Sequence, residues 1–397
     1  MAIKTSIDIL FFTLFILLTI NVVYLLVFSV AGYLGEIKKC ENCGSYFSFL
    51  VLIPAYKEDG VIINTAEQAI KQNYPRDKYK VVVIADSMRE ETIAKLRNIP
   101  IEVLEVNFSN SSKAKALNFA LKQCGDEDYE AVLILDADNI MSADFLIKMN
   151  RELQGGFIAA QGHRVAKNQN TPMALLDAVS EEINNHIFRK GHRILGFSSA
   201  LIGSGMAFRY KYFKRMMEKI DSMGEDKEME LLLLRDKFKV AYVDDALVYD
   251  EKVQDITVFK VQRRRWISAQ LFFFQKYFIS GWISLIKDRN TDYFNKVFQT
   301  FLFPRIMLLG LTTTFAITSF FFPIMPSFQG WLILWVLCIA TLWFALPARF
   351  LNRKLLLAIL YLPKVFFEMF LMLFKLKGES QKFSHTPHSV VETEKKF

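Results

Sequence analysis

Three groups of polar residues, far apart in the chain, have the types and spacing needed for chemistry on a phosphorylated substrate. Asp136 and Asp138 are separated by one residue and directly follow the apolar run Ala131 to Leu135. Two carboxylates at the end of a buried strand can share a hard divalent cation, and Mg²⁺ or Mn²⁺ held in this way usually also takes phosphate oxygens of a substrate as ligands. The alternative is that these carboxylates only cap a following helix.

A second acidic pair, Glu225 and Asp226, lies in a polar turn before the apolar run Met229 to Leu234. The pair could simply stabilise the N-terminus of a helix. It could also supply a general base, a carboxylate that takes a proton from an attacking hydroxyl group.

The third group is Gln262, Arg263, Arg264, Arg265 and Trp266. Three consecutive arginines beside a tryptophan could bind lipid headgroups. However, positions 262, 265 and 266 share one face of a helix, so they offer an amide, a fixed cation and an aromatic plate together. That set suits a pyrophosphate and a sugar ring.

Alternating strands and helices surround the first of these groups. Short β-branched runs are predicted as strands at 49–54, 79–86, 101–106 and 131–135, and helices are predicted between them at 60–71, 89–97 and 113–124. This spacing predicts an α/β fold with a parallel sheet covered on both faces. Ligands of such sheets bind beyond the carboxyl ends of the strands, where Tyr56, Lys57, Glu58, Asp86 and Ser87 lie beside the Asp136–Asp138 pair.

The flanks of this region have membrane character. Half of the chain is apolar (52%), yet 23% is charged, a combination that fits a chain with one water-soluble part and one lipid-soluble part. Ile7 to Val30 is long enough to cross a hydrocarbon core and too long for the apolar region of a signal peptide. Lys38 and Lys39 follow it, which predicts an outside N-terminus and a cytoplasmic catalytic region.

Further apolar segments follow near the C-terminus. Ile267 to Ile286 is predicted to lie in the membrane interface, and Phe298 to Phe322 with Trp331 to Leu346 is predicted to form a crossing hairpin. Leu355 to Leu376 has basic residues at both ends and is predicted as an interfacial or re-entrant helix before a cytoplasmic tail. The net charge of +8 collects beside these segments, which favours contact with anionic lipid over nucleic acid.

The remaining reactive residues are interpreted as structural. Cys40 and Cys43 lack the two further ligands of a zinc site and are expected to be free thiols. His186 and His192 have no metal-binding context and are expected to be structural as well.

Taken in order, the motifs resemble those of the processive family 2 glycosyltransferases, which include cellulose, chitin and hyaluronan synthases. The similarity spans about Phe49 to Phe278, and its most specific element is Q-x-x-R-W at Gln262 to Trp266. The other matching segments are Ile53 to Glu58, Asp86, Lys113 to Asn118, Asp136 to Asp138, Gly203 to Gly205, Glu225 with Asp226, and a remnant of a gating loop at Phe383 to His388.

The resemblance implies a GT-A (Rossmann-like) fold, a nucleotide-sugar donor, usually a UDP-sugar, and Mg²⁺ or Mn²⁺ as cofactor. Tyr56, Glu58 and Asp86 would contact the nucleoside, Lys115 the diphosphate, and Asp136 would lie near the donor with Asp138 on the metal. Asp226 would be the catalytic base with Glu225 beside it. Gln262, Arg265 and Trp266 would hold the pyrophosphate and line the acceptor site, and Gly203, Ser204 and Gly205 would face the acceptor.

These expectations describe a multi-pass enzyme of the inner or plasma membrane that inverts the anomeric centre while extending a glycan or a lipid-linked acceptor. About three crossings are too few for a large translocation channel, so a homo-oligomer or an export partner would be needed to move a polymer. Two alternatives stay open, namely single-sugar transfer to a polyprenyl phosphate and a non-catalytic subunit of an export complex. The predicted divisions are 1–46, 47–266, 267–297, 298–348 and 349–397.

Overall fold

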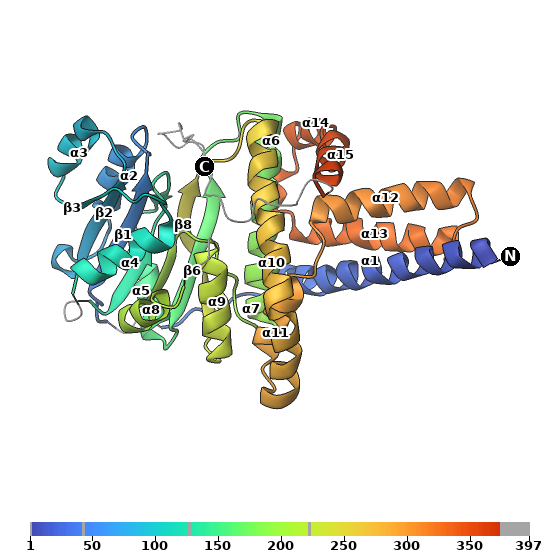
Figure 1. The fold of residues 1–397 in the computed structure, drawn as a ribbon, viewed down its shortest axis with the longest axis horizontal. Coiled ribbons are helices and arrows are strands. Elements are labelled where there is room, and N and C mark those ends of the chain that lie inside the picture. The colour runs from blue at the N-terminus through green and yellow to red at the C-terminus, as the bar shows by residue number, and fades with distance from the viewer. Residues whose placement is uncertain (1, 42–43, 126–128, 221–223, 374–397) are drawn as a thin grey trace.

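The computed structural model describes residues 2–41, 44–125, 129–220 and 224–373. Figure 1 shows an α/β unit at one end and a group of apolar helices at the other, with α6 and α10 between them. The expected gating-loop remnant at Phe383 to His388 and Cys43 of the cysteine pair lie outside the described residues.

The α/β unit is built on one eight-stranded sheet with the order β3-β2-β1-β4-β7-β6-β8-β5. The predicted strands are confirmed to within two residues. The strands are β1 (Phe49–Tyr56), β2 (Tyr79–Asp86), β3 (Glu102–Val106), β4 (Ala131–Ile134), β5 (Ile140–Met141), β6 (Ala159–Ala166), β7 (Met206–Arg209) and β8 (Val240–Asp250).

The sheet is mixed, so the prediction of a parallel sheet is correct for only part of it. β1, β2, β3 and β4 pair in parallel, and β6 pairs in parallel with β8. β7 lies antiparallel between β4 and β6, and β5 is antiparallel to β8. The short strands β5 and β7 carry no long β-branched run, and therefore the sequence pattern did not reveal them.

Both faces of the sheet are covered, as predicted. Along β1, Val51 and Ile53 point into one apolar cluster while Leu50 and Leu52 point into another, because successive side chains of a strand face opposite sides. The covering helices are α2 (Ile62–Ala69), α3 (Glu90–Arg97), α4 (Lys113–Gln123), α5 (Phe145–Gln154), α8 (Tyr210–Met217) and α9 (Glu225–Arg235).

A long helical segment connects the sheet to the apolar helices. It comprises α6 (Pro172–Asn184), the π-helix η2 (Asn185–Gly191) and α7 (His192–Ile194). The His192 ring stacks on Phe28 with ring centroids 3.6 Å apart, and His186 Nε2 contacts the Ser29 carbonyl oxygen at 2.8 Å. Both histidines therefore join this segment to α1 (Ala2–Leu34), which confirms their structural role.

The apolar helices differ in two respects from the predicted segments. The Gln262–Trp266 motif and the Phe-rich stretch share one helix, α10 (Ile256–Asp288), so the predicted division between 266 and 267 falls inside it. The segment predicted at 298–322 is interrupted before Pro304, and its second part is α12, of 17 residues. The remaining elements are α11 (Thr291–Gln299), α12 (Arg305–Phe321), α13 (Phe328–Ala345), α14 (Arg353–Ile359) and α15 (Leu362–Leu373).

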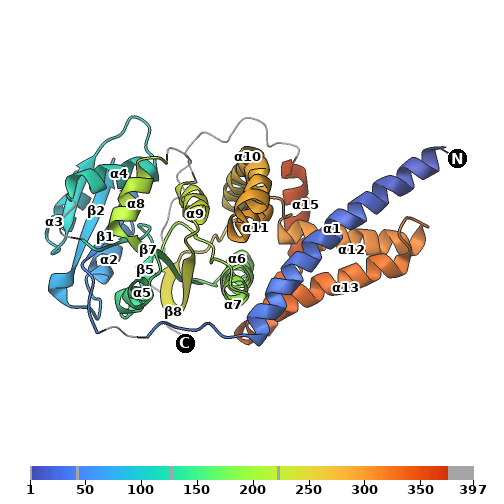
Figure 2. The same ribbon diagram turned by 90° about the horizontal axis from the view of Figure 1, so that it is seen from below.

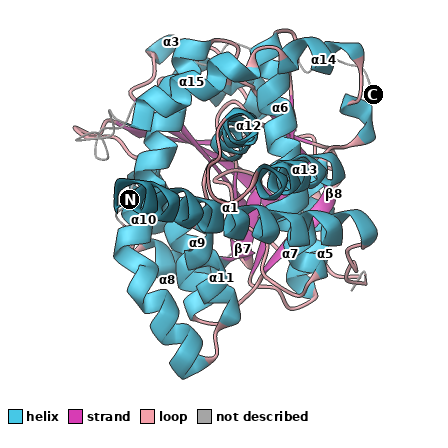
Figure 3. Cartoon of the chain, turned by 90° about the vertical axis from the view of Figure 1, so that its right-hand side faces the viewer, coloured by secondary structure: helices cyan, strands magenta, loops and turns pink. Residues whose placement is uncertain are grey.

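Among the described residues, two helices are long and apolar enough to cross a membrane, namely the part of α1 at Ser6–Leu34 and α13. α14 and α15 together would make a third, bent by 41° at their junction, and α12 is a shorter apolar helix. Figures 1 and 2 show α1, α12 and α13 extending together away from the sheet, with α10 and α11 lying across their direction. Figure 3 views α12 and α13 nearly end-on, with α1 crossing beside them.

Candidate functional site

A cavity of about 810 Å³ lies between the sheet edge and helices α6, α9, α10 and α12. Its volume is within the range of roughly 300–1,000 Å³ usual for ligand sites. It brings together most of the predicted site residues. Those that line it are Tyr56, Glu58, Asp86, Asp136, Asp138, Gly203, Glu225, Asp226, Gln262, Arg265 and Trp266.

The carboxyl edge of β1 and β2 forms the side of the cavity that the sequence predicts for the nucleoside. Tyr56 and Asp86 are the last residues of these strands and are partners in the sheet register. The residues that follow them, Lys57 and Ser87, both have φ of 56°, a left-handed conformation that is uncommon without glycine. The backbone therefore turns sharply after each of these two strands at the sheet edge. The Ser87 hydroxyl donates to Asp86 Oδ1 at 2.9 Å and helps to fix this carboxylate.

Lys113, at the first turn of α4, connects the acidic groups of the site. Its ammonium group donates to Asp136 Oδ1 and to the Gly203 carbonyl oxygen, the latter at 2.7 Å, and lies 3.7 Å from Glu225 Oε1. Burial disfavours the charge of Lys113, but Asp136 and then Glu225 more than offset this effect and raise its pKa. A fixed cation therefore stands between the Asp136 strand end and the start of α9.

Lys115, the lysine expected at the diphosphate, does not line the cavity. Its side chain instead donates to the Asn110 carbonyl oxygen at 2.8 Å, and its backbone N–H donates to the N-capping Ser112 hydroxyl. Positions 113 and 115 lie about 200° apart around a helix, so only one of the two lysines can face the site. The orientation of α4 on the sheet selects Lys113.

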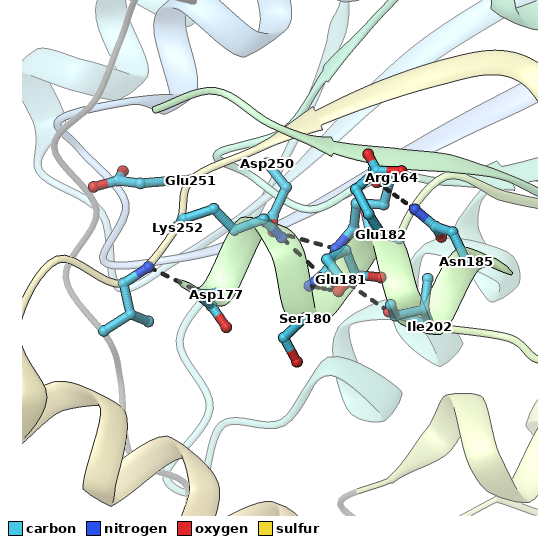
Figure 4. A network of polar contacts seen from close by, with 12 residues as sticks. Arg164, Asp177, Ser180, Glu181, Glu182, Asn185, Ile202, Asp250, Glu251 and Lys252 are labelled. Atoms are coloured by element: carbon cyan, nitrogen blue, oxygen red, sulfur yellow. Dashed lines mark hydrogen bonds and ion pairs between the residues drawn. The ribbon is translucent and has the colours of Figure 1, made fainter. Parts of the chain in front are cut away.

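A buried charge network that no sequence motif marked lies at the ends of β6 and β8 (Figure 4). Arg164 of β6 pairs with Asp250 at the end of β8 (3.2 Å) and with Glu181 of α6 (3.8 Å), and Lys252 contacts Asp250 at 2.7 Å. Burial opposes the charge of Arg164, but Asp250 and Glu181 raise its pKa overall. The network joins β6, β8 and α6, and the Asp138 carboxylate also favours the charged form of Arg164.

Asp138 itself is 5% exposed, and its Oδ2 accepts a long hydrogen bond of 3.4 Å from the Glu251 backbone N–H. Lys167 donates to the Asp138 carbonyl oxygen. No cluster of three or more His, Cys, Asp or Glu side chains that could hold a metal occurs in the described part of the chain. Two carboxylates nevertheless fit Mg²⁺ or Mn²⁺, because such ions commonly bind through one or two carboxylates plus substrate phosphates.

Glu225 and Asp226 are the first two residues of α9, so they occupy a helix N-terminus. Both also line the cavity. Burial raises the pKa of Glu225 to about 7, Lys113 opposes this shift, and the neighbouring Asp226 adds to it. A Cβ atom on Gly203 would lie 3.6 Å from Asp226 Oδ2, so the Gly203 backbone passes close to this carboxylate.

The α10 residues form the wall opposite the sheet. Gln262, Arg265 and Trp266 line the cavity together, as their shared helical face predicted. Arg263 turns toward α6, where it pairs with Asp177, and its guanidinium lies 4.3 Å from the Trp266 ring centroid. The Arg263 contacts therefore anchor the motif helix to α6 and support the tryptophan.

Ser204 and Gly205, expected to face the acceptor, lie behind the cavity wall. The Ser204 hydroxyl is fully buried and accepts from the Asp136 backbone N–H at 2.9 Å. Gly205 has φ of 62°, and a Cβ there would meet Val248 Cγ1 at 2.7 Å. These residues thus position the end of β4, and Gly203 is the member of the three that lines the cavity.

Residues 48–269 match the family described as Glycosyltransferase like family 2. This match covers more than half of the chain and includes the sheet, the acidic pairs and the α10 motif. The chain belongs to glycosyltransferase family 2.

Individual relatives of this family 2 chain are distant. The Bacillus subtilis (strain 168) protein named "Probable glycosyltransferase YdaM" is 24% identical over 278 residues, which cover 66% of this chain and 64% of that protein. An Arabidopsis thaliana protein named "Probable glucomannan 4-beta-mannosyltransferase 14" is 26% identical over 284 residues, which cover 66% of this chain and 52% of that protein. The chain thus spans between about half and two thirds of the length of these relatives.

Two solved structures are similar to this family 2 chain at low TM-scores. The mannosyltransferase PcManGT from Pyrobaculum calidifontis, in complex with GDP-Man and Mn²⁺, is 16% identical with a TM-score of 0.46, over 82% of this chain and 97% of that chain. Residues 1–349 of S. aureus TarS, in complex with UDP, are 18% identical with a TM-score of 0.37, over 56% of this chain and 64% of that chain.

Proposed function

We propose that this family 2 chain is a membrane-integrated glycosyltransferase that transfers a sugar from a nucleotide sugar, a UDP-sugar by the resemblance of its motifs, to a glycan acceptor with inversion. One observation carries the proposal: Asp138, Asp226 and Arg265, from three distant parts of the chain, line one cavity. Family membership supports the reaction type, and the motif order supports a place among the polymer-forming members.

The donor would lie along the sheet edge. Tyr56, Glu58 and Asp86 would bind the nucleoside, and Lys113 takes the place expected for Lys115 near the diphosphate. Asp138, with Asp136 beside it, would hold the divalent cation, which offsets charge on the leaving diphosphate when bound. Arg265 and Gln262 would contact the same phosphates from α10.

The acceptor hydroxyl would approach between Trp266 and Gly203. Asp226 would take its proton while the hydroxyl oxygen bonds to the anomeric carbon and the diphosphate leaves. Glu225, whose pKa burial raises to about 7, lies 3.7 Å from the Lys113 ammonium group and adjusts the charge beside the base Asp226. A single displacement of this kind inverts the anomeric centre.

The proposed topology follows from the helix arrangement. The N-terminus and the α12–α13 connection lie at the same end of the helical group, opposite the sheet (Figure 1). The connection at 322–327 contains no Lys or Arg, whereas Arg349, Arg353 and Lys354 follow the return helix. By the positive-inside rule, the sheet would be cytoplasmic and the enzyme multi-pass in the inner or plasma membrane. In the proposed divisions the glycosyltransferase domain begins at residue 47 and extends past 266 to the end of α10 at Asp288.

The test uses the full-length protein in lipid nanodiscs with Mn²⁺ and a panel of UDP- and GDP-sugars. We expect nucleotide diphosphate release with one donor, and a product that can be sized. Asp226→Asn should lower kcat by about 10²–10⁴-fold with donor binding retained. Turnover of Asp226→Asn within a few-fold of wild type would refute the base assignment, and absence of turnover with every donor would refute the proposed activity.

A further inference from the structure

The segment at residues 200–203, which precedes β7, lines the cavity beside the proposed base. It ends at Gly203, whose backbone passes close to the Asp226 carboxylate. In the proposed mechanism the acceptor hydroxyl approaches between Gly203 and Trp266. The distance between this segment and the start of α9 must therefore be fixed if the base is to meet that hydroxyl group.

Glu230 makes a direct contact between α9 and this segment. It lies four residues after Asp226, so the two side chains share one face of the helix. Glu230 is 2% exposed, and its Oε2 accepts a hydrogen bond of 3.2 Å from the Leu201 backbone N–H. The base and the residue that holds the 200–203 segment thus project from the same side of α9.

The neighbours of Leu201 are bonded to other elements. The backbone N–H groups of Ala200 and Ile202 donate to η2 and to β6, and the Gly203 carbonyl oxygen accepts from α4. The Leu201–Glu230 hydrogen bond joins the segment to the helix that carries the base. Its loss would leave the segment attached to these three elements but would loosen its distance to α9.

A lysine of α11 holds the Glu230 carboxylate. Lys296 Nζ lies 2.8 Å from Glu230 Oε2, and the Lys296 side chain is only 12% exposed. Burial raises the pKa of Glu230, and Lys296 opposes this shift more than any other group does. Lys296 therefore favours the carboxylate, which is a stronger acceptor for the Leu201 N–H than a neutral carboxyl group. The pair also connects α9 to α11, which lies beside it (Figures 1 and 2).

We propose that Glu230, held by Lys296, is a positioning residue of the transfer reaction, which fixes the Asp226 carboxylate relative to the 200–203 segment. This inference rests on the proposed function, because it takes Asp226 as the base. The residues that line the cavity include Asp226 and Leu201 but not Glu230. Glu230 therefore acts through its neighbours and does not touch the sugars.

The test measures donor turnover per nucleotide-binding site in the full-length protein in lipid nanodiscs. The nucleoside diphosphate that the wild-type protein releases is the binding probe that counts the sites. The main variant combines Glu230→Leu with Lys296→Met, because removing one member alone would leave a buried charge without its partner. We expect kcat per site to fall at least about tenfold, with the donor KM within twofold of wild type, since a small displacement of a reacting group strongly lowers the rate.

A second ion pair on the same helix supplies the matched control. Glu228 Oε1 lies 3.0 Å from Lys276 Nζ, and this pair joins α9 to α10 instead of to the 200–203 segment. Glu228→Leu with Lys276→Met should keep kcat per site within threefold of wild type. A role in folding alone would reduce nucleotide sites and turnover together, and it would do so in both double variants.

The conservative variant Glu230→Gln separates the hydrogen bond from the charge. Its amide oxygen can still accept from the Leu201 N–H, so we expect kcat per site to be restored to within about fivefold of wild type. This variant also keeps the side-chain volume.

Three results would overturn the inference. The first is a kcat per site within threefold of wild type in the Glu230–Lys296 double variant, and the second is an equal loss in the Glu228–Lys276 control. The third is a loss in Glu230→Gln as large as that in the double variant. Failure of the proposed function is a separate outcome, because it would appear as absent turnover of every donor by the wild-type protein.

Discussion

Replacing Glu225 with glutamine tests whether the pKa of this carboxyl is raised, because the substitution then changes the stability of the protein in a pH-dependent way. Burial raises the pKa of the Glu225 carboxyl from 4.5 to about 7 in the folded protein. The folded state therefore binds its proton more tightly than the unfolded state does. Stability from this group is fully present below pH 4.5 and is lost as pH rises toward 7.

The size of the effect follows from the two pKa values. With 1.36 kcal/mol per pKa unit, ionised Glu225 costs the folded protein about 3 kcal/mol at pH 8 but about 1 kcal/mol at pH 5. Glutamine keeps the shape of the side chain and has no charge at either pH. The advantage of Glu225→Gln over wild type should thus grow by about 2 kcal/mol between pH 5 and pH 8.

The assay is thermal unfolding in lipid nanodiscs with EDTA and without donor, at pH 5 and at pH 8. For a domain of this size, the difference in Tm between Glu225→Gln and wild type should increase by on the order of 5 °C across this range. Glu67→Gln, an exposed substitution on α2, is the matched control and should show the same difference at both pH values.

A Tm difference for Glu225→Gln that does not change with pH would refute the reasoning, as would a variant less stable than wild type at pH 8. Either result would mean that Lys113 compensates the Glu225 charge fully. Burial would then not determine whether the Glu225 carboxyl is protonated.

Three further predictions concern the proposed metal ligand Asp138, the lysine Lys113 and the packing of η2 on α1. Asp138→Asn should raise the Mn²⁺ concentration for half-maximal donor turnover at least about tenfold, because a ligand is lost; an unchanged metal titration would contradict this role. Lys113→Met should lower turnover at least about 100-fold while Lys115→Met stays within a few-fold, since only Lys113 contacts Asp136 and Glu225; equal effects would contradict the assignment of this role to Lys113 alone. Gly191→Ala should destabilise the protein by about 1–3 kcal/mol, because its Cβ would lie 2.0 Å from the Phe28 carbonyl oxygen; a Tm equal to that of wild type would contradict the close packing of η2 on α1.

Local sequence patterns were sufficient to predict much of the fold. β1, β2 and β4 are continuous apolar runs buried on both faces of the sheet, so their residue types alone predict them. Helical periodicity also placed Gln262, Arg265 and Trp266 on one face, and the structure turns that face toward the cavity. The length of the Ile7–Val30 run likewise identified α1.

Contacts between distant segments decided the rest. Arg164, Glu181 and Asp250 form one buried network, yet 86 residues separate the first from the last and no local spacing relates them. The Ser204 hydroxyl accepts a hydrogen bond from the Asp136 backbone N–H only because β7 pairs antiparallel with β4. Arg305 reaches the Ser180 hydroxyl only because α12 packs against α6.

The sequence by itself determined β1 to β4 and the helices between them, the apolar segments and the residues of the family motifs, because each depends on residues that are near one another in the chain. Only the tertiary structure decided which of Lys113 and Lys115 enters the site and which carboxylates lie around the Lys113 ammonium group. Those outcomes depend on burial and on charges brought together through space. A linear pattern does not contain that information.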